Sequence, residues 1–568
     1  MSYFLKQSKL KKGLYLQIYE GYHDPKRKHS VNRSVLSLGY LEDLISEEMP
    51  DPISYYKAKV KKMNEERLKK LQVDNIRLID DGAYKNIGYF LIKAFFNRVD
   101  IRHDFSLMSI NNDLQFNIYD LLTSLVYARI VEPCSKLKTY DEIIPDLFEE
   151  FSFSKDQMYR GLELLGEYHP WIIEIINYHY KKAFNRKTNH VYFDCTNYYF
   201  EIDFEDELRK KGPSKENKPN PLLGMGLLLD EEQIPLATKF YPGNQSELPK
   251  LSEVIKEMKD IHKIKGKTIR VADKGLNSAK NIQETILSHD GYLFSQSVKK
   301  LPEIEKKWVL LESGYKEVRN KEGKVLYFYK DCIDDFPYKY ENENGQKVTI
   351  NLRQKRLATY NPKLAKKKRL EIEKMIAKIE GLKVSKAKQN EYGDAAKYVK
   401  FVAFDKDGEV STQKELGVIL NEEKIKEDLA LAGYNVLITS ETRMSNQEIY
   451  DVYHRLWWIE ETFRILKSKL EARPVYVQNE YSIYGHFLIN YIAVFILRVL
   501  QIKTFKNEIH VNEIIDYVRS LNVTPENKRY INNGKRINIE LINNSLNLNT
   551  LNYYLSEKDI QKLFKFKI

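Results

Sequence analysis

The order of predicted elements within one stretch of this 568-residue chain limits the fold more than any other feature. HVYFDCTNYYFEI (190–202) is rich in aromatic and β-branched residues, which is typical of a strand. Three further strands and a helix follow the same patterns, in the order PLLGMGLLLD (221–230), QIPLATKFYPGN (233–244), a helix from about Leu248 to His262, and KTIRVADKGLNS (267–278). Later strands are YLFSQSV (292–298) and YNVLITS (434–440). This succession predicts an α/β fold.

Two aspartates stand at informative places in these strands. Asp194 lies in the middle of the first strand, where an unpaired carboxylate is costly unless it binds a cation. Asp273 ends the later strand just before a Lys-Gly turn, and loops at strand ends often carry chemistry. Taken singly, each aspartate is as well explained as a turn former or a satisfied polar group. A third acid elsewhere in the chain favours a shared site.

That third acid belongs to a predicted helix, residues 445–470, whose start is marked by a capping box of Ser445 and Glu448. In a continuous helix, residues seven apart share one face, and this spacing relates Tyr453, Glu460 and Lys467. The two outer side chains are roughly 21 Å apart along the axis, so they contact different atoms, as along a polymer. Alternatively, this is an amphipathic surface helix with ordinary charges.

These segments resemble the DDE transposases of bacterial insertion sequences, and more narrowly the insertion sequence four group. The resemblance covers roughly residues 75–500, and its motifs are DCTNYYFE, VADKGLNS, the Glu460 helix, LEARPVY (470–476), KGPSKE (211–216) and FYPGNQSELPK (240–250). The group signature is Tyr, two residues, Arg, three residues, Glu, six residues, Lys. It matches Tyr453, Glu460 and Lys467, whereas the Arg position holds Leu456.

Either Arg455, Arg464 or no residue takes the phosphate-contacting role of the missing arginine. Arg455 is one residue away, about 100° around the helix, so it does not simply substitute. Arg464 returns within about 40° of the Glu460 face and is the better candidate for the phosphate contact.

The resemblance implies a ribonuclease-H-like catalytic core in which Asp194, Asp273 and Glu460 are catalytic and hold two divalent cations. Mg²⁺ suits hard carboxylate oxygens, and Mn²⁺ is possible. Tyr453, Lys467 and Arg464 would contact DNA. Glu461 is the rival third acid, but Glu460 has the better register with Tyr453 and Lys467.

The implied function is a DNA transposase that cleaves the ends of an insertion element and joins the freed 3′-hydroxyls to target DNA. Its partners would be the terminal inverted repeats and the target, bound by a homodimer. A catalytically inactive or domesticated DNA-binding protein and a ribonuclease-H-like nuclease without strand transfer are the alternatives.

The composition agrees with a polyanionic partner and a cytoplasmic location. The formal charge is +12 and the isoelectric point is about 9.0, which favours nucleic acid. The three cysteines are too few and too scattered for a disulfide framework or a zinc site, which fits a reducing cytosol. The start of the chain lacks the apolar stretch of a signal peptide, and the run FLINYIAVFILRVL (487–500) is too short to span a bilayer.

Composition also divides the chain into regions. We expect a β-rich module (1–50), a helical connector and DNA-binding domain (51–186), a catalytic core in two parts (187–298 and 434–501), an inserted domain (299–433) and a C-terminal region (502–568). Within the second region, residues 138–168 form either a helix-turn-helix or part of a plain bundle. Within the insertion, the lysine-rich helix 363–381 is either a solvated face or a clamp on DNA phosphates.

Overall fold

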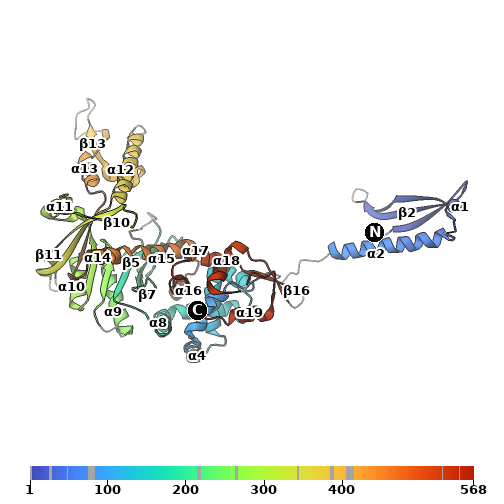
Figure 1. The fold of residues 1–568 in the computed structure, drawn as a ribbon, viewed down its shortest axis with the longest axis horizontal. Coiled ribbons are helices and arrows are strands. Elements are labelled where there is room, and N and C mark those ends of the chain that lie inside the picture. The colour runs from blue at the N-terminus through green and yellow to red at the C-terminus, as the bar shows by residue number, and fades with distance from the viewer. Residues whose placement is uncertain are drawn as a thin grey trace. The chain divides into compact units, whose positions relative to one another are not determined.

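The computed structural model describes residues 3–24, 29–47, 49–74, 84–213, 219–262, 266–341, 345–383, 389–404, 415–526, 529–548 and 550–568. Residues 214–216 of the KGPSKE motif lie outside these ranges. The chain forms two compact units, Met1–Ala83 and Tyr84–Ile568, which are described separately (Figure 1).

The N-terminal unit is an antiparallel sheet with a long helix on one face. Its elements are β1 (Tyr3–Leu10), β2 (Gly13–Asp24), β3 (His29–Tyr40), α1 (Leu41–Leu44) and α2 (Pro52–Asp74). Leu16 and Ile18 are fully buried, and Arg67 of α2 pairs with Glu20 of β2 at 2.6 Å. Because these contacts tie α2 to the strands, α2 belongs to the N-terminal unit, whereas the predicted boundary lay at residue 50.

The second unit is built on a mixed sheet, so the expected α/β class is confirmed. In the described part of the chain the sheet has nine strands in the order β10-β11-β12-β15-β9-β8-β5-β6-β7. β5 pairs parallel with β8, β8 pairs parallel with β9, and the other neighbours are antiparallel. The strands are β5 (His190–Tyr199), β6 (Leu222–Leu229), β7 (Pro235–Pro242), β8 (Ile269–Ala272), β9 (Gly291–Gln296), β10 (Lys316–Arg319), β11 (Val325–Glu341), β12 (Lys347–Tyr360) and β15 (Tyr434–Thr439).

Alternate residues of the strands point to opposite faces of this sheet, and each face has its own core. Tyr192, Tyr198 and Val271 pack with helices α14 (Asn446–His454), α15 (Trp457–Arg464) and α16 (Glu480–Val499). Phe193 and Ala272 pack on the other face with helices α9 (Lys250–His262), α10 (Ala279–Leu287) and α11 (Glu303–Leu310). We call the face of Tyr192 and Val271 the acidic face, since Asp194 and Asp273 continue the same alternation on it.

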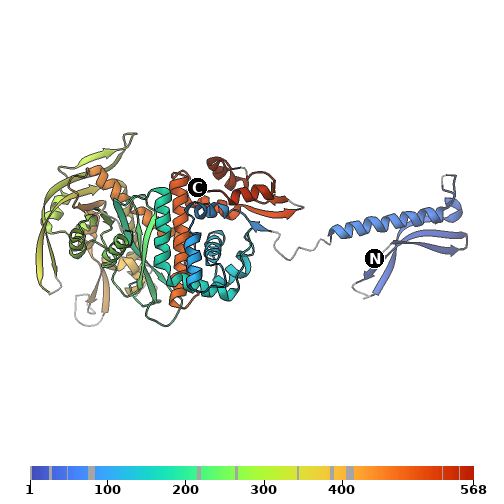
Figure 2. The ribbon, with the colours of Figure 1, turned by 90° about the horizontal axis from the view of Figure 1, so that it is seen from below.

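Helix α16 joins the sheet to the helical part of the unit. In Figure 2 this orange helix runs between the sheet and the blue helices of residues 84–167, and the teal helix of residues 169–184 lies on its sheet side. Among the described residues, Glu480–Thr504 is the one helical stretch apolar and long enough to cross a membrane, but 94% of its apolar window is buried inside the fold. That burial is the setting of a core helix.

The helical part contains β4 (Lys85–Asn86), α3 (Phe90–Val99), α4 (Arg102–Asn111), α5 (Ile118–Val131), α6 (Lys136–Lys138), η1 (Thr139–Ile143), α7 (Lys155–Glu167) and α8 (His169–Phe184). A capping box of Ser154 and Gln157 starts α7. A Cβ on Gly166 of α7 would lie 1.7 Å from the Tyr481 carbonyl oxygen of α16, so the two helices pack at close range. α7 is therefore embedded in a bundle, while the side chains of Lys155 and Arg160 are exposed.

The segment predicted as an insertion divides in two. β10, β11 and β12 extend the large sheet beyond β15, while a second part has its own small core. That part consists of α12 (Pro362–Lys383), η3 (Gln389–Tyr398), β13 (Val399–Phe404), β14 (Glu415–Leu420) and α13 (Glu422–Ala430). η2 (Val298–Lys300) leads into the insertion from β9.

The C-terminal region completes a small sheet of order β18-β17-β16-β4. Its elements are η5 (Leu500–Thr504), α17 (Val511–Ser520), β16 (Asn522–Glu526), β17 (Arg529–Asn532), α18 (Arg536–Leu546), β18 (Tyr554–Ser556) and α19 (Glu557–Phe564).

Candidate functional site

The two predicted aspartates are next neighbours across the sheet. The parallel register pairs Phe193 of β5 with Ala272 of β8, so Asp194 and Asp273 follow at the same level. Adjacent strands lie about 4.8 Å apart, and both side chains point to the acidic face. β8 ends at Ala272 while β5 continues to Tyr199, which opens the sheet beside Asp194.

This position is also where the connections diverge. From β5 the chain runs to β6 and β7 on one side, and it returns to β8 and β9 on the other. Open α/β sheets bind ligands beyond the carboxyl ends of their parallel strands at such a switch point. The topology therefore favours a binding site at the two aspartates.

Tyr453, from the last turn of α14, reaches the same site. Its hydroxyl donates a hydrogen bond of 2.9 Å to the Asp273 carboxylate. Burial and the charge of Asp273 raise the pKa of Tyr453 well above its ordinary value, so the phenol stays protonated and acts as a donor. Close by, Ser295 of β9 donates to the Asn435 side chain of β15 at 3.1 Å. One carboxylate, one phenol and two neutral polar groups thus gather at the strand ends.

Helix α15 and its neighbours run along β5. Near the start of this run, burial raises the pKa of Tyr192 to about 12, and the nearby Arg455 guanidinium counteracts part of this rise. At the other end, the Lys467 ammonium lies 5.4 Å from the ring centre of Tyr198. The twelve residues from Arg455 to Lys467 rise about 18 Å along the helix, and the six residues from Tyr192 to Tyr198 span about 20 Å along β5. The helix and the strand therefore cover similar distances. By the same reckoning Glu460 lies about level with Asp194.

The predicted continuous helix over residues 445–470 is wrong, because it is interrupted at Arg455 and Leu456. Backbone bonds that span three residues tighten the chain here, as from the Leu456 amide to the Tyr453 carbonyl at 3.0 Å. Further on, η4 (Ile465–Lys469) is a wider π-helical turn. Each tightened residue turns the helix roughly 20° further than an α-helical residue. Tyr453, Glu460 and Lys467 therefore do not form one straight row.

At the helix start, the Ser445 side chain accepts a bond from the Glu448 amide at 3.1 Å, which is the N-cap half of the predicted box.

The two candidate glutamates have different surroundings. Glu461 is buried at 7% exposure, forms an ion pair with Arg464, and lies 3.7 Å from the His510 ring. Its negative charge also acts on Arg498. Burial lowers the pKa of Arg498 to about 9, and the Glu461 carboxylate counteracts part of that shift. Glu460 is exposed, and within the described ranges no hydrogen bond or ion pair involves it. Glu461 is thus part of a network with Arg464, His510 and Arg498, whereas the exposed Glu460 carboxylate is accessible to a ligand.

The predicted triad is only partly assembled. Among the described residues there is no group of three or more His, Cys, Asp or Glu side chains placed to hold one metal ion. Asp194 and Asp273 are neighbours by strand register, and the Glu460 carboxylate does not complete a three-residue cluster with them.

The arginine predicted to contact DNA is engaged in an ion pair. Arg464 binds Glu461, three residues earlier in α15, although in the same helix it also lies one turn from Glu460. Arg455 instead lies beside Tyr192, two residues from Asp194 on the acidic face. The tightened turn rotates every residue after Leu456 relative to Tyr453.

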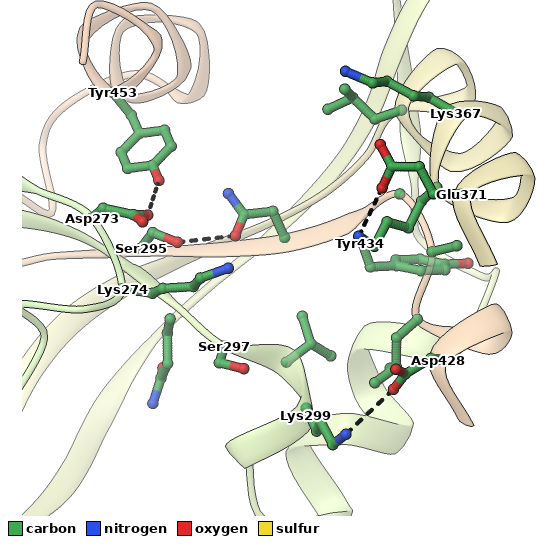
Figure 3. Close-up of a pocket in the computed structure, with 18 residues that line it drawn as sticks. Asp273, Lys274, Ser295, Ser297, Lys299, Lys367, Glu371, Asp428, Tyr434 and Tyr453 are labelled. Carbon is green, nitrogen blue, oxygen red and sulfur yellow. Dashed lines mark hydrogen bonds and ion pairs between the residues drawn. The ribbon is translucent and has the colours of Figure 1, made fainter. Parts of the chain in front are cut away.

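A cleft of about 560 Å³ opens in front of Asp273 and Tyr453 (Figure 3). Its other side is formed by α12 of the insertion and by the loop before β15. Lysines line it from several elements: Lys274, Lys299, Lys367 and Lys368. Lys299 lies 3.3 Å from Asp428, and Lys368 lies 2.9 Å from Glu371. In the part of the chain that the structure describes, Lys274 and Lys367 take part in no ion pair, so the cleft has positive charge to spare.

A comparison of the sequence with protein-family profiles finds no match, and neither does a comparison with curated proteins. The family resemblance therefore stays a hypothesis carried by the motifs and by the geometry above.

Three residues of the site were missed in the sequence. Lys274 directly follows Asp273, and a base beside a candidate catalytic acid at a strand end was the available signal. Ser295 and Asn435 come from separate halves of the core, and their pairing depends on the antiparallel contact of β9 with β15. No local pattern indicates that contact.

Proposed function

We propose that this protein is a DNA transposase of the DDE type. It would cleave the ends of an insertion element and transfer the 3′-hydroxyls into target DNA. The observation that carries the proposal is the adjacency of Asp194 and Asp273 at the ends of two parallel strands, with Asp273 in the wall of a lysine-lined cleft.

The strand order supports a ribonuclease-H-like core. The strands β5, β6 and β7 form an antiparallel meander, and β8 and β9 add to β5 in parallel. The first and fourth strands of this succession carry the two aspartates, and the helix with the third acid packs on the same face. This arrangement agrees with the fold that the resemblance implies.

The donor set suits a hard divalent cation. Carboxylate oxygens are the ligands that Mg²⁺ prefers, with Mn²⁺ as a substitute. Asp194 and Asp273 would hold it, and Glu460, which lies about level with Asp194 and is not committed elsewhere, would join them. When bound, two such ions activate a water or 3′-hydroxyl and stabilise the leaving oxygen.

The surrounding groups suit a DNA strand. Lys274 and Lys367 stand ready to contact phosphates, and Lys467 and Arg455 extend the positive charge along the acidic face. The Tyr453 phenol orients the Asp273 carboxylate by its hydrogen bond. We propose that the protein acts as a homodimer on DNA in the cytoplasm.

A DNA-binding protein without cleavage activity is the second candidate. It is favoured by the unassembled triad and by Leu456 at the arginine position of the signature. The same lysine-lined cleft would then serve binding alone.

Cleavage of a duplex that carries the gene-flanking DNA separates the two candidates. Asp194→Asn, Asp273→Asn and Glu460→Gln should each abolish Mg²⁺-dependent cleavage and strand transfer but leave DNA binding largely intact, because amides keep the shape and lose the charge. Glu461→Gln is the matched control and should retain activity at temperatures where it is folded. Full activity in any of the first three variants removes that residue from the site. A wild-type protein that binds but never cleaves supports the second candidate.

A further inference from the structure

The sheet of the N-terminal unit has an outer face opposite α2. Leu16, Ile18 and Glu20 point towards α2, so the alternate residues of β2 point away from it. The pairing register aligns Phe4 with Tyr19, Lys6 with Gln17, and Tyr15 with Tyr40 on this outer face. These side chains are exposed or half-exposed.

The outer face is ordered by contacts among its own side chains. The Lys6 ammonium lies 4.4 Å from the ring centre of Tyr19, and Phe4 packs on the same ring at 6.0 Å. Tyr15 and Tyr40 meet edge to face at 5.0 Å. The Gln17 amide donates to the Ser37 hydroxyl at 3.1 Å, which fixes its orientation. A polar amide thus stands at a defined place in the centre of an aromatic surface.

The charge of this face has one sign. Lys6 lies on it, and Lys11 and Lys12 are exposed in the turn that joins β1 to β2. Where the side chains of residues 3–21 and 31–40 are described, the one carboxylate is Glu20. It lies on the inner face and is held by Arg67 and Arg33. The described side chains of the three strands thus place positive charge on the outer face, while the Glu42 carboxylate of α1 lies beside the β1–β2 turn, 3.9 Å from where a Cβ on Gly13 would be.

The width of the face selects the partner. Three strands about 4.8 Å apart span roughly 10 Å, which fits the DNA major groove of about 12 Å but not the minor groove of about 6 Å. We infer that the outer face of the β1–β3 sheet docks in the major groove of duplex DNA. The lysines contact phosphates, and Gln17 presents its amide to base edges. The nature of the partner rests on the proposed function.

Full-length variants and labelled duplexes test this inference by fluorescence anisotropy. One duplex copies the gene-flanking DNA and another has a mixed sequence. The variant Lys6→Gln/Lys11→Gln/Lys12→Gln should bind about tenfold or more weakly, and the salt slope of log affinity should fall by up to about 2.7. The control Lys57→Gln/Lys59→Gln/Lys61→Gln removes the same charge from exposed positions of α2 and should stay within about twofold of wild type. Equal losses in both variants, or none in either, overturn the inference.

Sequence preference provides a second readout. Gln17→Ala should reduce the preference for the flanking duplex over the mixed duplex with little change in salt slope, because a base contact carries specificity. Tighter binding of the corresponding single strand than of the duplex would overturn the major-groove assignment. If wild type never cleaves but the lysine effect persists, the proposed activity fails and the docking face stands. If wild type cleaves and the lysine variant binds normally, the docking face alone fails.

Discussion

Replacing Lys274 and Lys367 with Gln should strongly weaken the grip of the cleft on DNA. Both ammonium groups line the cleft beside Asp273, and among the described residues neither is engaged in an ion pair. Their charge is therefore available to phosphates. A hydrogen bond to a charged group contributes about 1.5–3 kcal/mol, and exposure of both lysines places them at the low end. Two such contacts give about 3 kcal/mol, or roughly 150-fold in affinity.

The assay is DNA binding by anisotropy in an Asp194→Asn background, which separates binding from cleavage. The salt slope should fall by about 1.8 for two lost phosphate contacts. Lys363→Gln/Lys366→Gln is the matched control, since both lysines are exposed on α12 but do not line the cleft. An equal loss of affinity in the control would show that the lysines of α12 act through general surface charge and not through the cleft. No loss in the test variant would refute the cleft as a DNA path.

Three further predictions concern the helices on the acidic face. Arg455→Ala should slow end cleavage in a single-turnover assay more than Arg464→Ala does. Arg464→Ala should instead lower the melting temperature, because it leaves buried Glu461 with a weaker partner. A severe cleavage defect at Arg464 alone would contradict this placement. Lys467→Ala should reduce cleavage and end-complex stability by roughly ten- to a hundredfold, and Lys469→Ala far less, with equal gel-shift and cleavage defects as the contrary result. Tyr453→Phe removes the bond to Asp273 and should lower the cleavage rate by about fivefold, a loss of about 1 kcal/mol, so an unchanged rate would exclude a positioning role.

Local sequence patterns predict the strands and the places of the acids well. β5, β6, β7, β8, β9 and β15 lie where aromatic, β-branched and apolar runs indicate strands, and Asp273 stands directly after β8 as expected. These features depend on neighbours in the sequence, because a half-buried pleated surface selects such residues. The long apolar run of α16 is a buried helix for the same reason.

The features that the sequence does not reveal depend on distant contacts. The register of β5 with β8 makes Asp194 and Asp273 neighbours, and no local signal carries a register across 79 residues of chain. The interruption at Leu456 occurs without proline or glycine, so helix propensity gives no warning of it. That small change in winding rotates α15 relative to Tyr453, and Arg455 at the interruption lies beside Tyr192. Position along a helix was predictable, whereas angle around it was not.

Binding of Mn²⁺ to the full-length protein, followed by electron paramagnetic resonance and calorimetry, tests the central claim most directly. If Asp194 and Asp273 share a cation site, wild type should bind Mn²⁺ and Mg²⁺ should compete, while Asp194→Asn and Asp273→Asn should each lose at least one ion. Glu460→Gln should lower the affinity, with the larger effect when DNA is present. Unchanged Mn²⁺ binding in both aspartate variants would contradict the account, because the carboxylates would then have no part in holding a metal.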